Sequence, residues 1–99
     1  MRLSPVDIAG IKSAVASVAG DAARVRLFGS RLDDRLRGGD IDLLIEFETP
    51  VDQPVVLAAR IGTAIERRIG ERRIDVLIDA PNLEPQAVRT AARRGGVLL

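Results

Sequence analysis

Residues 39–47 read Gly-Asp-Ile-Asp-Leu-Leu-Ile-Glu-Phe, and the fold that we expect follows from this stretch. The part from Asp40 onward is mostly apolar, which predicts a largely buried strand. Side chains two residues apart in a strand point to the same face, so Asp40 and Asp42 should stand side by side, roughly 6 to 7 Å apart along the backbone. Ile41 and Leu43 then point the other way, into a core covered by helices.

Two ionised carboxylates on one face of a sheet repel each other unless they are solvated or bridged by a cation. The chain has no histidine and no cysteine. This absence excludes Ser-His-Asp hydrolases, cysteine nucleophiles, disulfides and metal sites built on imidazole or thiolate. The cation that remains is a hard one, Mg²⁺ or Mn²⁺, which binds carboxylate oxygens, water and phosphate.

Asp75 supplies a third carboxylate, inside an apolar run that predicts a strand over residues 73–79. An acid in such a place is unfavourable unless it faces solvent or a ligand. If the two acidic strands are neighbours, the three carboxylates meet on one open face. They could then hold two metal ions about 3.5 to 4 Å apart, as phosphoryl and nucleotidyl transfer require. The alternative at this point is that Asp75 is a strand-end acid paired with Arg72 or Arg73.

A glycine and a serine precede the acidic strand and complement it. Gly29 lets a backbone approach a phosphate closely. Ser30, at the start of a short helix, offers a hydroxyl and backbone amides to a polyphosphate, and Arg31 can add a forked contact. Together with the carboxylates, these residues could hold a nucleoside triphosphate.

The rest of the chain alternates helical and strand-like patterns. A first helix should begin at Pro5, with Ser4 as its N-cap, and end before Gly20. The other expected elements are a strand over 24–28, one or two helical turns from near Ser30, the strand over 40–47, a helix over about 52–69, the strand over 73–79, a helix from Asn82 to Arg94, and an edge strand over 97–99. This order predicts an α/β or α+β sheet with helices packed mainly on one face.

The chain has 99 residues and a formal net charge of +1, from 15 basic and 14 acidic side chains. This length allows one domain, which we place at 1–99. The balanced charge and the two aromatic residues argue against direct binding of nucleic acid. We also expect no membrane association and a cytoplasmic location, because no apolar run could span a bilayer and residues 1–5 carry no secretory signal.

Gly29-Ser30, a nine-residue gap, Asp40-Ile41-Asp42 and the later Asp75 together resemble the polymerase-β-like nucleotidyltransferase superfamily. The compact length is similar to that of its minimal (MNT-type) branch. The resemblance implies an α+β fold with the order αβαβαβα and a small mixed sheet of three to four strands. It also implies catalytic and metal-binding roles for Asp40, Asp42 and Asp75, and nucleotide-binding roles for Gly29, Ser30 and Arg31.

The resemblance further implies a Mg²⁺-dependent (or Mn²⁺-dependent) transfer of AMP from ATP to a hydroxyl of a partner protein, as in toxin–antitoxin pairs. The implied partner is a HEPN-type protein, or else a further copy of the chain. The alternative is a catalytically weak or inactive antitoxin that neutralises such a partner by occlusion; the extra acids Asp33 and Asp34 favour it. A two-metal nuclease would suit the carboxylates but leaves Gly29 and Ser30 unexplained.

Overall fold

A computed structural model describes residues 3–28, 41–84 and 95–99. The elements in these residues are α1 (Pro5–Ala19), β1 (Arg24–Phe28), β2 (Ile41–Glu46), α2 (Pro54–Ile69), β3 (Ile74–Asp79) and β4 (Val97–Leu98). The four strands form one sheet in the order β3-β2-β1-β4. β1 runs antiparallel to β2 and β4, whereas β2 and β3 are parallel. The expected α+β class with a small mixed sheet is therefore confirmed.

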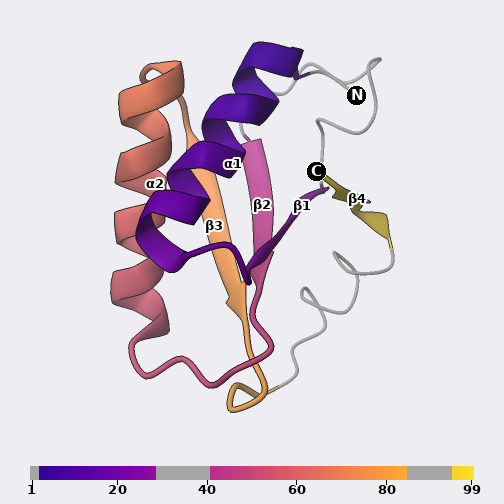
Figure 1. Ribbon diagram of the computed structural model, residues 1–99, viewed down its shortest axis with the longest axis vertical. Coiled ribbons are helices and arrows are strands. Elements are labelled where there is room, and N and C mark those ends of the chain that lie inside the picture. Colours follow the sequence, from indigo (N-terminus) through magenta and orange to yellow (C-terminus); the bar gives the residue numbers. More distant parts are fainter. Residues whose placement is uncertain (1–2, 29–40, 85–94) are drawn as a thin grey trace.

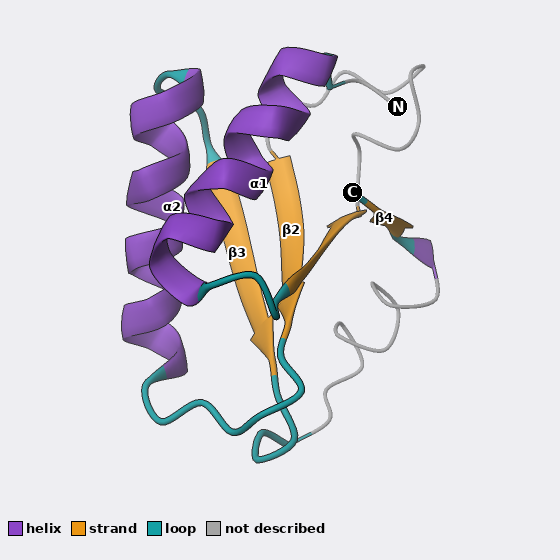
Figure 2. Ribbon diagram, viewed as in Figure 1, coloured by secondary structure: helices purple, strands orange, loops and turns teal. Residues whose placement is uncertain are grey.

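Both helices lie on the same face of the sheet (Figures 1 and 2). The position of α2 follows from the topology, because parallel neighbours such as β2 and β3 need a long crossover between them and α2 is that crossover. The opposite face of the sheet is free of described helices. Asp42 of β2 and Asp75 of β3 are on that opposite face, since the residues on either side of Asp42 are buried beneath the helices.

The core lies between the helices and the sheet. Ile41, Leu43 and Ile45 of β2 are fully buried in it, which confirms the predicted alternation of the strand. The helices contribute residues at helical spacing, among them Ile61 and Ile65 of α2, both also fully buried. Each such aliphatic side chain stabilises the fold by roughly 1.5–3 kcal/mol relative to exposure.

The first helix begins as its sequence predicts. The backbone N–H of Asp7 donates to Ser4 Oγ at 3.1 Å, and Pro5 occupies the first turn. The carboxylate of Asp7 has a different role, because Arg72 Nη1 donates to its Oδ2 at 2.8 Å. The alternative in which Arg72 pairs with Asp75 is wrong, since the loop before β3 passes the start of α1 and brings the guanidinium of Arg72 to Asp7.

Gly10 lies where α1 and α2 approach closely. A Cβ atom added at this position would come within 2.6 Å of Ile69 Cγ2. Real Cβ atoms do not tolerate such an approach, so the crossing of the two helices requires glycine here. The sequence pattern alone does not reveal this role, because a glycine inside a helical pattern reads only as a weak helix former.

The second helix starts at Pro54, two residues later than expected, and Pro54 occupies its first turn. The reason is local: proline suits the first helical position, and the residue before a proline is driven away from helical geometry. Gln53 accordingly has non-helical backbone angles, φ −129° and ψ 74°, and its side chain makes no capping bond.

Asn82 does not cap a helix at the place expected. Its Oδ1 accepts from Val51 N at 2.9 Å and its Nδ2 donates to Val51 O at 2.8 Å, so it ties the turn after β3 to the loop before α2. Residues 81–84 are turn, bend and irregular backbone. The rest of that expected helix, like the short helix from Ser30, falls on residues outside the described ranges.

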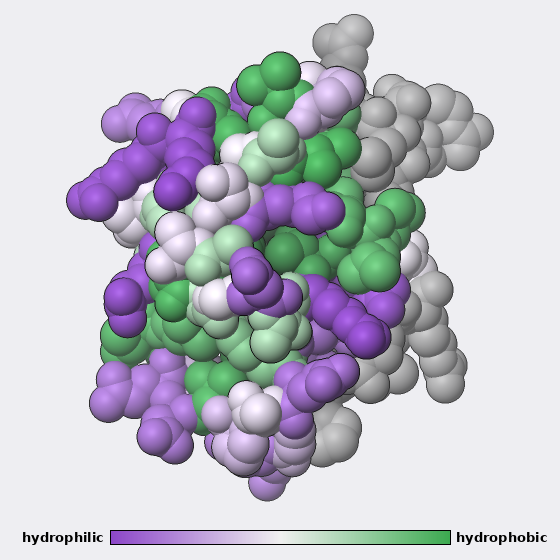
Figure 3. All heavy atoms as spheres, viewed as in Figure 1, coloured by the Kyte–Doolittle hydropathy of each residue, from purple (hydrophilic) through white to green (hydrophobic). Residues whose placement is uncertain are grey.

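Figure 3 shows hydrophilic and hydrophobic residues interspersed over the helix-covered side of the molecule. The surface of α2 includes Val55 and Val56, which are 82% and 51% exposed. Among the residues that the structure describes, neither helix has the length and hydropathy that a bilayer-spanning segment needs.

Candidate active site

The parallel pairing of β2 and β3 aligns Asp42 with Asp75. Each is the second residue of its strand, so both lie at the amino-terminal ends of the two strands. Neighbouring strands are roughly 4.8 Å apart, which places the two carboxylates within reach of one cation. The condition that the sequence left open, that the two acidic strands are neighbours, is met.

Burial shows which face the pair occupies. Ile41 and Leu43, on either side of Asp42, are fully buried beneath the helices. Asp42 is half-buried and Asp75 is exposed. By the two-residue period of strands, both acids therefore lie on the face away from α1 and α2. A ligand can approach Asp75 from solvent there, without displacing the hydrophobic core.

The third strand of this region is β1, whose last residue, Phe28, pairs with Asp42. Phe28 and Ile41 are the described residues that border residues 29–40, and both lie at the same end of the sheet as the acid pair. The remaining sequence-predicted site residues, Gly29, Ser30, Arg31 and Asp40, lie outside the described residues. Of the predicted site residues, the structure thus brings Asp42 and Asp75 together.

A second charged group occupies the same face at the other end of the strands. Glu46 pairs with Asp79 in the register of β2 and β3, and Arg26 Nε donates to Glu46 Oε1. These side chains are mostly shielded, with 21% exposure for Arg26 and 15% for Glu46. Leu44, fully buried, separates this group from Asp42. The sequence analysis missed this ion pair, whose signal is the alternation of arginines in residues 24–28.

The donor set at Asp42 and Asp75 suits a hard divalent cation. Both side chains provide carboxylate oxygens, the ligands that Mg²⁺ and Mn²⁺ prefer. Within residues 3–28, 41–84 and 95–99, no three acidic side chains are close enough to form a complete metal cage. Mg²⁺ binds through one or two protein carboxylates together with water and substrate phosphates, so the described pair fits that mode of binding.

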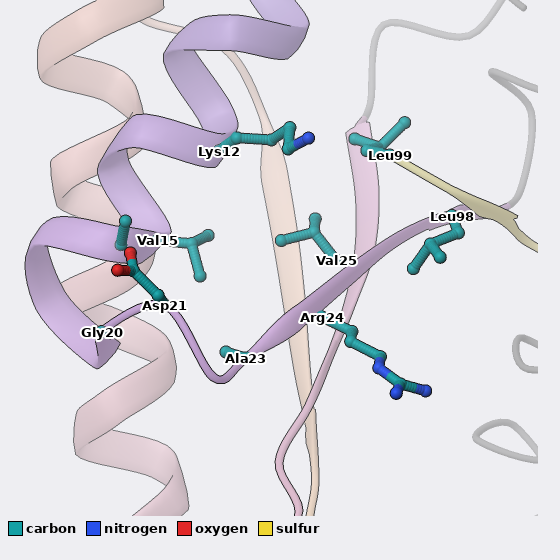
Figure 4. A pocket seen from close by; sticks show the side chains of 10 residues that line it. Lys12, Val15, Gly20, Asp21, Ala23, Arg24, Val25, Leu98 and Leu99 are labelled. Atoms are coloured by element: carbon teal, nitrogen blue, oxygen red, sulfur yellow. The ribbon is translucent and has the colours of Figure 1, made fainter.

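Two hollows lie near the sheet and differ in their relation to the acid pair. One, of about 300 Å³, lies between α2 and β3 and includes Asp75 in its lining. The other, of about 280 Å³, lies between α1 and the β1–β4 edge. Figure 4 shows Val15 and Val25 facing each other across this second hollow, with Lys12 extending from α1 towards Leu99. Because neither Asp42 nor Asp75 lines it, the hollow beside α1 is separate from the candidate site.

Comparison with known proteins agrees with this arrangement. A family model described as "Nucleotidyltransferase domain" matches residues 8–95. A comparison with curated proteins gave no match. The matched range contains Asp42 and Asp75 together with β1, β2 and β3, the strands that form this end of the sheet.

Proposed function

The chain belongs to the nucleotidyltransferase domain family, and on that basis we propose that it transfers AMP from ATP to a hydroxyl group of a partner protein. Nucleotidyl transfer in general follows from the family. The nucleotide, the acceptor and the metal are our proposal. The observation that carries it is the alignment of Asp42 with Asp75 on the face of the sheet away from α1 and α2.

In this proposal Asp40, Asp42 and Asp75 hold two Mg²⁺ ions, for which Mn²⁺ can substitute. When bound, the ions polarise the α-phosphate and offset the charge of the leaving pyrophosphate. Asp75 is the carboxylate nearest the sheet edge, and it orients the acceptor hydroxyl and accepts its proton. The acceptor oxygen bonds to the α-phosphorus, the bond from this phosphorus to the bridging oxygen breaks, and pyrophosphate leaves with the electron pair.

Gly29, Ser30 and Arg31 are assigned to the triphosphate. Glycine allows close approach of the backbone, and serine and arginine donate hydrogen bonds to the β- and γ-phosphates. The support from the described residues is positional: Phe28, which immediately precedes Gly29, is the pairing partner of Asp42. A triphosphate held after β1 therefore lies beside the acid pair.

The proposed acceptor is a protein encoded with this chain, of the HEPN type, and the pair would act as toxin and antitoxin. This choice rests on the resemblance of the motif set to minimal nucleotidyltransferases. The exposure of Asp75 supports a macromolecular acceptor, because an exposed carboxylate at a sheet edge is accessible to a large partner.

The test uses ATP labelled either at the α- or at the γ-phosphate, incubated with Mg²⁺, the chain and the product of the neighbouring gene. Transfer of AMP labels the partner from α-labelled ATP alone and adds the mass of one AMP. Asp42→Asn should reduce labelling by more than about 100-fold, because Asp42 is a direct ligand and the loss of an outer-shell partner alone costs about 10- to 100-fold. Asp21→Asn, the same change at an exposed acid in the turn after α1, is the matched control.

Labelling from γ-labelled ATP would indicate a kinase instead and contradict the proposal. If the partner binds and loses its activity without gaining mass, the chain acts by occlusion, and transfer is not its function. Full labelling by Asp42→Asn would overturn the assignment of this carboxylate to the metal.

A further inference from the structure

The backbone groups of β3 alternate between the edge next to β2 and the opposite, outer edge. Within residues 3–28, 41–84 and 95–99, β3 is the outermost strand of the sheet on its side. Arg73 O accepts from Ile41 N at 2.8 Å and Asp79 O accepts from Phe47 N at 2.8 Å, so the odd-numbered residues of β3 direct their backbone groups towards β2. Because these groups alternate along a strand, the N–H and C=O of Val76 point outward, away from the sheet.

A hollow adjoins this edge on its helix side. The hollow of about 300 Å³ lies between α2 and β3, and its lining includes Ile74, Asp75 and Val76 from the strand. On the helix side it is lined by Gly62, where an added Cβ would meet no atom within 4 Å. Ile74 and Val76 are only partly buried, so their side chains offer apolar contact on the helix side of the edge.

We propose that this edge of β3 binds the acceptor protein as an extended segment, which places its hydroxyl-bearing residue opposite Asp75. The inference rests on the proposed function and adds the geometry of the acceptor. Strand addition at a sheet edge is a general mode of peptide recognition, in which backbone hydrogen bonds provide affinity and alternate side chains provide specificity. Here Val76 provides the outward backbone donor and acceptor.

The position of Asp75 within β3 links docking to chemistry. Its own backbone points to β2, so an antiparallel segment meets it in a non-hydrogen-bonded pair, with Cα atoms about 4.5 Å apart and side chains close together. A serine, threonine or tyrosine at that place lies on the same face as Asp42 and Asp75. Its hydroxyl oxygen attacks the α-phosphorus and its proton passes to Asp75, as in the transfer described above.

The flanking residues of such a segment point to the helix side, over the hollow. The charged residues that line the hollow are Glu66, which is exposed on α2, and Asp75. No basic residue is part of this lining in the described residues. A segment with a basic residue next to its hydroxyl residue therefore complements the charge of the edge, with Glu66 as the opposite charge.

The experiment compares two chains altered at the edge. Val76→Pro removes the outward N–H and leaves the pairing with β2 intact, since proline is accepted in edge strands whose N–H faces solvent. Val76→Thr keeps the N–H and the shape and is its control. Gly62→Leu fills the hollow, while Gly62→Ala adds one methyl group and is the second control. Thermal melting verifies that each chain is folded.

The probe is an array of unstructured peptides, each with a central serine, threonine or tyrosine, incubated with Mg²⁺ and α-labelled ATP. Pyrophosphate release with water as acceptor is measured in parallel. We expect labelling to favour peptides with a basic neighbour of the hydroxyl residue. We also expect Val76→Pro to lower labelling relative to pyrophosphate release by up to about tenfold, the loss of one backbone hydrogen bond. Gly62→Leu should lower the same ratio because its side chain fills the hollow over which the flanking residues of the segment lie.

Equal labelling by the altered and unaltered chains would overturn the edge as the acceptor site. Pyrophosphate release without labelling of any extended peptide would also overturn it and leave the proposed function standing. Absence of both labelling and pyrophosphate release from the unaltered chain would contradict the proposed function, and the inference with it.

Discussion

Asp42 and Asp75 are pairing partners in the parallel register of β2 and β3, although a whole helix separates them along the chain. Two like charges placed directly opposite one another destabilise a sheet. Such a pair is therefore a local departure from the best packing, of the kind found where a site binds a ligand.

Asp75→Asn should remove the repulsion between the two carboxylates, and it should also abolish binding of the metal. In a chelating buffer we expect the free energy of unfolding to rise by up to about 1 kcal/mol, because one of two facing charges is gone. In the unaltered chain, Mg²⁺ at about 100 times its dissociation constant should add roughly 2.7 kcal/mol, since it binds only the folded state. Thermal melting with and without Mg²⁺ measures both effects; an equal gain for Asp75→Asn would show that this carboxylate holds no metal.

Gly10→Ala should destabilise the fold although alanine is the better helix former. The added Cβ would lie 2.6 Å from Ile69 Cγ2, and such overpacking costs typically about 1–3 kcal/mol. Gly62→Ala, where the new Cβ meets no atom within 4 Å, should instead stabilise by about 0.5–1 kcal/mol. Urea unfolding of both chains measures the difference. Ile69→Leu, which removes the Cγ2 branch, should restore part of the loss, and failure to do so would implicate another contact.

Arg72→Gln should weaken the attachment of α1 to the loop before β3. Arg72 Nη1 donates to Asp7 Oδ2 at 2.8 Å, and the two side chains are 33% and 16% exposed. A partly shielded charged pair of this kind contributes about 1 kcal/mol, more than a fully exposed pair. A double-mutant cycle with Asp7→Asn isolates the interaction energy. Additive losses in the cycle would mean that the two side chains do not act on each other.

Asn82→Ala should lower the free energy of unfolding by about 1–3 kcal/mol, since it leaves the backbone N–H and C=O of Val51 without their partner. Val51 is 9% exposed, so water replaces these bonds poorly. Gln53→Ala, in the same loop, removes an exposed amide that makes no capping bond and should change stability little. Chemical denaturation compares them, and a similar loss for both would show that Asn82 has no special role.

Local patterns in the sequence were sufficient for most elements. The cap at Ser4, the strand at Arg24–Phe28 and the buried alternation of β2 follow from hydrogen bonding and side-chain periodicity within a few residues, and the structure has them as predicted. The start of α2 differs from the expected one, because the conformational preferences of proline place the first helical residue at Pro54. The site assignment of Gly29, Ser30, Arg31 and Asp40 stays a prediction, because these residues are outside the described ranges.

Near neighbours along the chain were enough to predict which face of each strand is apolar and where α1 starts, because these properties depend on local periodicity and capping. The folded chain was needed to show that Asp42 pairs with Asp75, that Arg72 binds Asp7, that Asn82 holds Val51 and that Gly10 has no room for a Cβ atom. The physical reason is that each of these contacts joins segments far apart in the chain. Their distance in space depends on strand order and helix crossing, which periodicity does not encode.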